Sequence, residues 1–531
     1  MSTRATACLA LAVGMSWFAG AAAARQQAPR VDYSTRQASA VRYLKVTNPT
    51  EDDRLGRGDP LVGVMLAMSA DGNTLAVSTP HEDSGATGVN GNPRDESAWD
   101  SGAVYVFVRS GARWVQQAYI KASNAQSSDR FGIAIALSGD GNTLAVGATL
   151  EDSGARAING NQADNSAESA GAVYVFARTG DRWAQQAYIK ASNADAGDQF
   201  GWSVALSNDG STLAVGAQSE ASAVAGISPP SPGGSGGTGG NQEDNSAPDA
   251  GAAYVFVRRG ATWTQQAYIK PSNTQGGDRF GFSITVSGDG NTLAAGSYDE
   301  DGNAAGVNGV SNEEAPNSGA AYVFVRRGEA WTQEAYVKQS ITVRNSAFGS
   351  AVALSGDGAT LAVGAVDETN LTRGIDGDQT STQNNAVSAG AIYVFGRAGG
   401  WRQQAYVKSF NIGPTDLFGI RLALSRDGSV LAAGAPGQSG GGRGVNANPE
   451  DFTAPESGAV YVFLRSGGRW MQHAYIKAPN AEPFDQFGSG VALSADGATM
   501  AVAANGEDSG SGSNGDQNDN AVRDSGALFI F

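Results

Sequence analysis

Apolar and polar positions follow a unit of about seventy residues that recurs seven times along this chain. In the clearest copy, short apolar segments at 132–137 and 143–147 flank a tight Ser-Gly-Asp-Gly turn at 138–141, and a long polar loop follows. Residues 172–178 are then apolar on both faces, and residues 183–191 mix apolar and polar positions. A fixed period indicates a repeat architecture, and Asp-Gly between alternating segments is typical of β-hairpins. Each unit is therefore predicted to be a four-stranded meander.

The seven copies are marked by their hairpin turns. The aspartates of these turns are Asp71, Asp140, Asp209, Asp289, Asp357, Asp427 and Asp496. The third strand needs cover on both faces, whereas the fourth, with Gln185, Gln186 and Lys190, is expected to be more exposed. A meander of this kind fits one blade of a β-propeller, in which neighbouring sheets cover both faces of the inner strands. The tryptophan and lysine that recur in each fourth strand are predicted to pack blades together or to cap the rim.

The order of the copies predicts how the ring closes. The seventh copy ends the chain at its third strand, residues 528–531. The missing fourth strand is found at the front, where residues 43–45 repeat the Tyr-x-Lys pattern of residues 119–121. We therefore predict an all-β chain with one seven-bladed β-propeller of four-stranded blades over residues 41–531. Its ring is expected to be closed by an N-terminal outer strand that joins three C-terminal strands.

Two dipeptides in each unit resemble a known repeat. Phe-Gly opens the unit and Gly-Ala ends its second strand, as in Phe131-Gly132 with Gly147-Ala148, and Phe418-Gly419 is followed by Gly434-Ala435-Pro436. The pattern resembles the FG-GAP repeat of integrin α-chain N-terminal propellers and of many bacterial surface proteins. The resemblance implies a propeller, a role in adhesion or protein binding, and calcium between the first two strands. The turn at 138–141 offers fewer oxygen ligands than the six to eight that calcium takes.

The loops between the second and third strands are long and acidic, as in residues 151–170. Two fragments in these loops resemble calcium-loop spacing, namely Asp299, Asp301 and Asn303, and Asp516, Asn518 and Asn520. Neither has glycine at the sixth position or glutamate at the twelfth, so a solvated loop is the alternative interpretation. No cofactor is predicted to be required.

The net charge and the scarcity of histidine and cysteine limit the classes of function that this chain can have. The net charge of −16 argues against nucleic acid as a partner. The two histidines, His81 and His473, fall on different kinds of element, and no carboxylate pair stands out, so no catalytic residue is assigned. The only cysteine is Cys8. An Arg-Gly-Asp tripeptide at 57–59 is interpreted as a chance occurrence in a chain rich in glycine and aspartate.

The N-terminus has the pattern of a secretory signal. Residues 5–22 are largely apolar and follow Arg4, and small residues precede Arg25. We predict a signal peptide at 1–24, a flexible leader at 25–40 and a monomer that is periplasmic, cell-surface or secreted, with no membrane span after cleavage. An uncleaved anchor is the alternative.

Two functions remain open. The first is a non-enzymatic binding or adhesion scaffold for a protein or polysaccharide ligand, and the second is a propeller-type polysaccharide lyase or hydrolase. The partner is expected on the side that carries the long loops, with specificity from blades three, four and five. Acidic residues predicted to gather there are Glu82, Asp83, Glu151, Asp152, Asp299, Asp301, Glu507 and Asp508.

Overall fold

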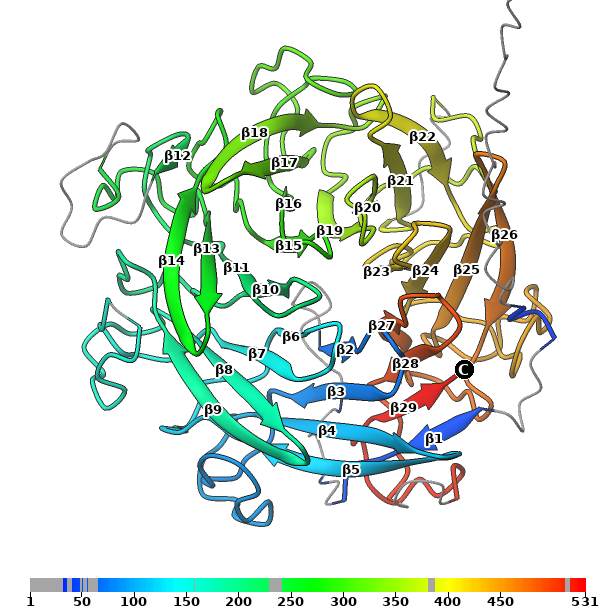
Figure 1. The fold of residues 1–531 in the computed structure, drawn as a ribbon. Coiled ribbons are helices and arrows are strands. Elements are labelled where there is room, and N and C mark those ends of the chain that lie inside the picture. The colour runs from blue at the N-terminus through cyan, green and yellow to red at the C-terminus, as the bar shows by residue number, and fades with distance from the viewer. Residues whose placement is uncertain are drawn as a thin grey trace, which may run out of the picture. The chain divides into compact units, whose positions relative to one another are not determined.

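The computed structural model describes residues 32–35, 41–47, 50, 55, 65–156, 158–228, 241–380, 387–510 and 516–531. The predicted signal peptide, the Arg-Gly-Asp tripeptide and the glycine-rich insertion at 229–240 lie outside the described residues. The rest forms seven sheets arranged in a ring (Figure 1), each built around a four-stranded antiparallel meander. This confirms the predicted all-β seven-bladed propeller. None of the described residues forms a helix with the length and apolar character needed to cross a bilayer.

Strands occupy four positions from the centre of the ring outward. The innermost strands are β2 (Leu66–Met68), β6 (Ile135–Leu137), β10 (Ser203–Leu206), β15 (Ser283–Val286), β19 (Phe348–Leu354), β23 (Arg421–Leu424) and β27 (Phe487–Leu493). The second strands are β3 (Thr74–Thr79), β7 (Thr143–Ala148), β11 (Thr212–Ala217), β16 (Thr292–Ser297), β20 (Thr360–Ala365), β24 (Val430–Ala435) and β28 (Met500–Ala504).

The third strands are β4 (Ala103–Ser110), β8 (Ala172–Thr179), β13 (Ala252–Arg259), β17 (Ala320–Arg327), β21 (Ala391–Gly396), β25 (Ala459–Ser466) and β29 (Ala527–Ile530). The outermost strands are β5 (Arg113–Ile120), β9 (Arg182–Ile189), β14 (Thr262–Ile269), β18 (Ala330–Val337), β22 (Arg402–Val407), β26 (Arg469–Ile476) and β1 (Arg42–Leu44). A two-residue strand, β12 (Ile227–Ser228), adds to blade three by pairing with β14.

The ring closes as the sequence predicts. β1 pairs antiparallel with β29, and Tyr43 lies opposite Phe529. The buried Tyr43 hydroxyl donates a hydrogen bond to Glu507 of the seventh blade, 2.9 Å away. Upstream, within the segment predicted as a leader, Tyr33 is buried and its hydroxyl donates to the carbonyl of Gly497 at 2.6 Å. The N-terminal strand therefore completes the outer edge of the last blade.

The glycines of the repeat allow neighbouring blades to approach closely. A Cβ atom on Gly147, at the end of β7, would lie 2.0 Å from the carbonyl oxygen of Gly201 in the next blade. Gly201 itself has a φ of 95°, in the left-handed region that favours glycine. The Phe-Gly and Gly-Ala dipeptides therefore meet across the blade interface, which gives the sequence pattern a packing role.

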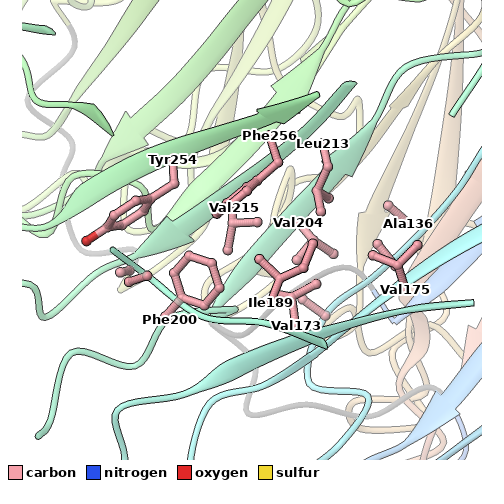
Figure 2. Close-up of a cluster of buried hydrophobic side chains, with 14 of the residues drawn as sticks. Ala136, Val173, Val175, Ile189, Phe200, Val204, Leu213, Val215, Tyr254 and Phe256 are labelled. Carbon is pink, nitrogen blue, oxygen red and sulfur yellow. The ribbon is translucent and has the colours of Figure 1, made fainter. Parts of the chain in front are cut away.

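Apolar cores lie between adjacent blades. Figure 2 shows the core between blades two and three, where Val173, Val175 and Ile189 face Phe200 and Val215. All five side chains are buried. The aliphatic residues on the facing sheets explain why third strands that are apolar on both faces recur in the sequence.

Candidate functional site

The two faces of the ring carry different connections. We call the side with the loops between second and third strands, together with the connections between blades, the long-loop face. These connections meet, because the amide of Phe200, which enters blade three, donates to the carbonyl of Ala170 in the long loop of blade two at 3.0 Å. The opposite side, the turn face, carries the Asp-Gly turns and the short turns between third and fourth strands.

The turn face is closed by local hydrogen bonds. Ser138 donates its hydroxyl to Asp140 at 2.5 Å, and the amides of Asn142 and Thr143 donate to Asp140 and Ser138 at 2.9 Å. Burial tends to raise the pKa of Asp140, but these hydrogen bonds outweigh it and lower the pKa overall. The turn aspartate therefore uses its carboxylate to hold the hairpin.

In six of the seven blades, a buried ion pair between a loop glutamate and a lysine that follows the outermost strand holds the long loop in place. In blade two, Lys190 is 1% exposed and contacts Glu151 at 2.9 Å, and Tyr188 donates its hydroxyl to the same carboxylate at 2.6 Å. Burial lowers the pKa of Lys190 although the carboxylate opposes this shift. The fourth strand is part-exposed at Gln185 and Gln186, as predicted, but the expectation that Lys190 is exposed is wrong, because the first glutamate of the loop turns inward. The pairs are Lys45–Glu507, Lys121–Glu82, Lys190–Glu151, Lys270–Glu220, Lys338–Glu300 and Lys408–Glu368.

Several acidic residues expected to attract a partner have structural roles. Glu82, Glu151 and Glu507 are at most 2% exposed and bind lysine, so the expectation that they are available to a partner is wrong. The aspartate that follows the glutamate closes the loop, as when Asp152 accepts the amide of Ser169 at 2.8 Å. Corresponding bonds are made by Asp83, Asp301 and Asp508.

The first group of candidate calcium ligands is engaged within its own loop. Asp299 lies 3.5 Å from the guanidinium of Arg279, Asp301 accepts the amide of Asn317, and Asn303 accepts the amide of Asn312. No cluster of three or more His, Cys, Asp or Glu side chains suited to a metal occurs among the described residues.

The second group is similarly engaged. Asp516 accepts the amide of Asn518 at 3.0 Å, and Asn520 donates to Glu482 at 2.6 Å. The two histidines also have separate partners, because His81 lies 2.9 Å from Asp100 and His473 lies 3.3 Å from Asp32.

Four recurrent tryptophans, Trp183, Trp263, Trp331 and Trp401, donate hydrogen bonds to the preceding blade. Trp183 is buried and donates its indole N–H to Gln117 of the preceding blade at 3.0 Å. The guanidinium of Arg178 lies 5.4 Å from the centre of the indole ring. This contact confirms that the tryptophan serves blade packing.

The blades differ most where the long-loop face surrounds the axis. The residue after the second-strand Gly-Ala pair changes from blade to blade, as Pro80, Thr149, Gln218, Tyr298, Val366, Pro436 and Asn505. At blades three and four, Phe282 lies between Trp202 and Tyr298, with ring centres 5.7 and 4.1 Å away, and Arg279 covers Tyr298 at 5.7 Å. This ring of variable residues breaks the sevenfold repeat.

A cavity of about 230 Å³ opens on this ring at blade six. Its walls come from the connections on either side of the blade and include Thr415, Leu417, Pro436, Glu456 and Asn505. Asn505 is 3% exposed, and its buried Oδ1 has no hydrogen-bond partner among the described residues. An unsatisfied buried acceptor costs free energy, so the cavity favours a hydrogen-bond donor.

The mouth of the cavity has exposed polar lining residues, Thr415 and Glu456, and exposed apolar residues precede other lining residues in the sequence. Val387, next to the lining residue Ser388, is 68% exposed, and Phe484, two residues before the lining residue Gln486, is 58% exposed. Phe484 has a φ of 70°, a left-handed conformation that bulky residues rarely adopt. The equivalent position before the Phe-Gly pair is glycine in the connections into blades three and four, at Gly197 and Gly277.

Blade six also lacks the buried ion pair. Gln438 replaces the loop glutamate and accepts hydrogen bonds from Lys477 and Tyr475, both at 3.0 Å. Burial lowers the pKa of Lys477 to about 7, against the opposing effect of Asp416. Sequence reasoning placed the asymmetry in the loops of blades three to five and missed blade six. Two residues in the sequence could have pointed to blade six. Gln438 stands where the other six repeats have glutamate, and Phe484 stands where other repeats have serine, glycine, asparagine or threonine.

Comparisons with known proteins agree with the repeat. A family profile described as the FG-GAP repeat matches residues 114–176, 183–227, 263–324 and 470–531. Among curated proteins, none matches the chain significantly.

Similar solved structures include the hydrazine synthase of Kuenenia stuttgartiensis, at 14% identity and a TM-score of 0.44, covering 84% of this chain and 94% of that one. The periplasmic gluconolactonase PpgL of Pseudomonas aeruginosa has 14% identity and a TM-score of 0.42, covering 82% and 96%. The β-propeller domain of Myceliophteria thermophila Cps50 (Swd1) has 9% identity and a TM-score of 0.44, covering 88% and 96%. Likenesses this distant carry no argument about activity. Four segments of this chain thus match the FG-GAP repeat, and the chain folds as a seven-bladed β-propeller.

Proposed function

We propose that this protein is an exported, non-enzymatic binding or adhesion scaffold whose protein or glycan partner docks on the long-loop face. The observation that carries the proposal is the distribution of differences between blades. The turn face and the blade interfaces repeat the same contacts, whereas the residues around the axis on the long-loop face vary. Specific recognition requires an asymmetric surface, and this face supplies one.

The loop carboxylates support binding rather than acid–base chemistry. Glu151 neutralises a buried lysine and Asp152 closes its own loop, so neither is directed at an open site. The apolar N-terminal segment that follows Arg4 supports export. The long-loop face also carries exposed apolar side chains such as Trp99, at 64% exposure, as expected of a surface that meets another molecule.

The test is a two-arm binding screen of the full chain against a displayed random-peptide library and a glycan array. Ligands found in either arm are re-measured with two loop variants in which 222–246 or 304–311 is replaced by a short Gly/Ser segment. Both variants keep Glu220 and Glu300, whose removal would leave Lys270 and Lys338 buried without a partner. A turn-face variant, Asp181→Lys, is the control.

We expect at least one ligand whose affinity falls tenfold or more in a long-loop-face variant and stays within twofold in Asp181→Lys. The proposal is overturned if neither arm yields a ligand. It is also overturned if every ligand is lost in the turn-face control alone.

A further inference from the structure

The cavity at blade six combines three independent features. It holds a buried acceptor without a partner, the Asn505 Oδ1. It is flanked by two non-glycine residues in left-handed conformations, Thr415 with a φ of 61° and Phe484 with a φ of 70°. Exposed apolar side chains, Val387 and Phe484, lie one and two residues from its lining residues Ser388 and Gln486.

The left-handed conformation recurs in the other described connections, at Ser128 and Asn345 as well, but the fold does not need a bulky residue there. The equivalent connections into blades three and four reach the same backbone path with Gly197 and Gly277. A β-branched residue and a phenylalanine in this conformation are strained, and such outliers cluster at functional sites. The exposed phenylalanine therefore points to a role outside the blade.

The size and polarity of the cavity limit what can enter. Its volume of about 230 Å³ is below the roughly 300–1,000 Å³ of small-molecule pockets, so it suits one inserted side chain. Arg421 contributes to its wall and donates to the carbonyl of Ser489 at 2.9 Å. The Glu456 carboxylate in the same wall offsets this guanidinium, so the lining carries no net charge and suits a neutral donor.

We infer that this cavity receives one neutral, hydrogen-bond-donating side chain of a protein partner, whose flanking apolar side chains pack on Val387 and Phe484. This inference rests on the proposed binding function and names the partner as a protein. Exposed apolar residues around a cavity with one buried polar group are typical of a protein–protein anchor site. The inserted hydroxyl or amide would donate to the Asn505 Oδ1, which restores the hydrogen bond missing from the unbound protein.

The test uses random twelve-residue peptides displayed on phage and selected on the full chain. The enriched pool is then bound to Phe484→Asn, which relieves the backbone, and to Asn505→Leu, which removes the acceptor. The matched controls are Val310→Asn, another exposed apolar loop residue at 97% exposure, and Gln218→Leu, at the position in blade three equivalent to Asn505.

We expect a loss of at least tenfold in pool binding for Phe484→Asn and Asn505→Leu, and less than twofold for the controls. The melting temperature of Phe484→Asn should be unchanged or higher, because asparagine tolerates positive φ. A drop of several degrees would mean that Phe484 is structural, and it would overturn the inference.

Other outcomes separate the inference from the proposed function. If binding is lost only in Val310→Asn or Gln218→Leu, the partner still binds the long-loop face, but the assignment of its site to blade six is overturned. A glycan ligand that is insensitive to all four variants, with no enriched peptide, also overturns it. Failure of both the peptide and glycan screens overturns the proposed function as well.

Discussion

At the scale of single residues, the buried lysine of the repeat has a charged partner in one blade and a neutral partner in another. Lys190 faces Glu151, whereas Lys477 faces the amide of Gln438 within an otherwise similar site. A buried lysine without a paired charge is destabilising when protonated, and its pKa falls in response. Blade six is therefore expected to be the least stable of the described blades in acid.

Gln438→Glu should restore the ion pair and raise the melting temperature, with a larger gain at pH 6 than at pH 9. The pKa of Lys477 is about 7 in the folded chain, below its ordinary value of 10.5. Between those values the unfolded chain binds more protons, so wild-type stability rises with pH and the advantage of the variant shrinks. Scanning calorimetry at the two pH values measures this difference.

The reciprocal variant is the control. Glu151→Gln makes blade two resemble blade six and should cost about 1.5–3 kcal/mol, the range for a hydrogen bond to a charged group. Two results would contradict this role of the lysine–glutamate pairs. One is a rise in melting temperature for Gln438→Glu that is equal at both pH values, and the other is an unchanged stability for Glu151→Gln.

At the scale of elements, the connections between blades carry buried aspartates. Each accepts an amide hydrogen bond from the residue three positions earlier, as Asp198 does from Asp195 at 2.9 Å. Burial raises the pKa of Asp129 and Asp416 to about 7 and of Asp198, Asp278 and Asp485 to about 8. In the connection into blade five, Ser346 takes this place.

The melting temperature is therefore expected to fall as pH rises from about 4 to about 8. Over this window the folded chain holds protons on these aspartates that the unfolded chain has lost, so the stability they contribute declines. Asp198→Asn keeps an oxygen acceptor and removes one titration, so its melting temperature should fall less between pH 5 and pH 8.5. An identical fall in both proteins would show that Asp198 does not titrate there.

The strands and blades could be predicted from the sequence more fully than the buried ion pairs and the cavity at blade six. The period, the Asp-Gly turns and the displaced Tyr43 pattern predict strands, blades and closure, because these depend on local turn chemistry and apolar alternation. The burial of Lys190 depends on a glutamate thirty-nine residues away, and the cavity depends on connections on both sides of blade six. Such contacts form only when the ring brings distant segments together, so the sequence does not reveal them directly. Their one visible sign is a substitution at a repeated position, such as Gln438.

At the scale of the whole molecule, closure joins the two ends of the described chain. β1 covers β29, and Lys45 contacts Glu507 at 2.9 Å. Without β1 the last blade would present an open edge, and Glu507 would be buried without its cation.

Deletion of residues 42–48 should lower the melting temperature sharply and promote aggregation. Loss of the cation alone is expected to cost about 3–5 kcal/mol, and the exposed edge of β29 adds to this. Lys45→Met, which keeps the strand, is the control and should be less destabilised than the deletion. A deletion variant that melts like the full chain would refute closure by β1.

The most direct test of the account is to shield one face at a time. In a Cys8→Ser chain, Val387→Cys on the long-loop face or Asp181→Cys on the turn face is coupled to a 5-kDa polyethylene glycol, a size on the order of a small domain. Binding of the selected peptide pool is then measured. We expect the polymer at position 387 to reduce binding tenfold or more and the polymer at 181 to leave it within twofold. Equal binding in both, or loss only at 181, would contradict the assignment of the long-loop face.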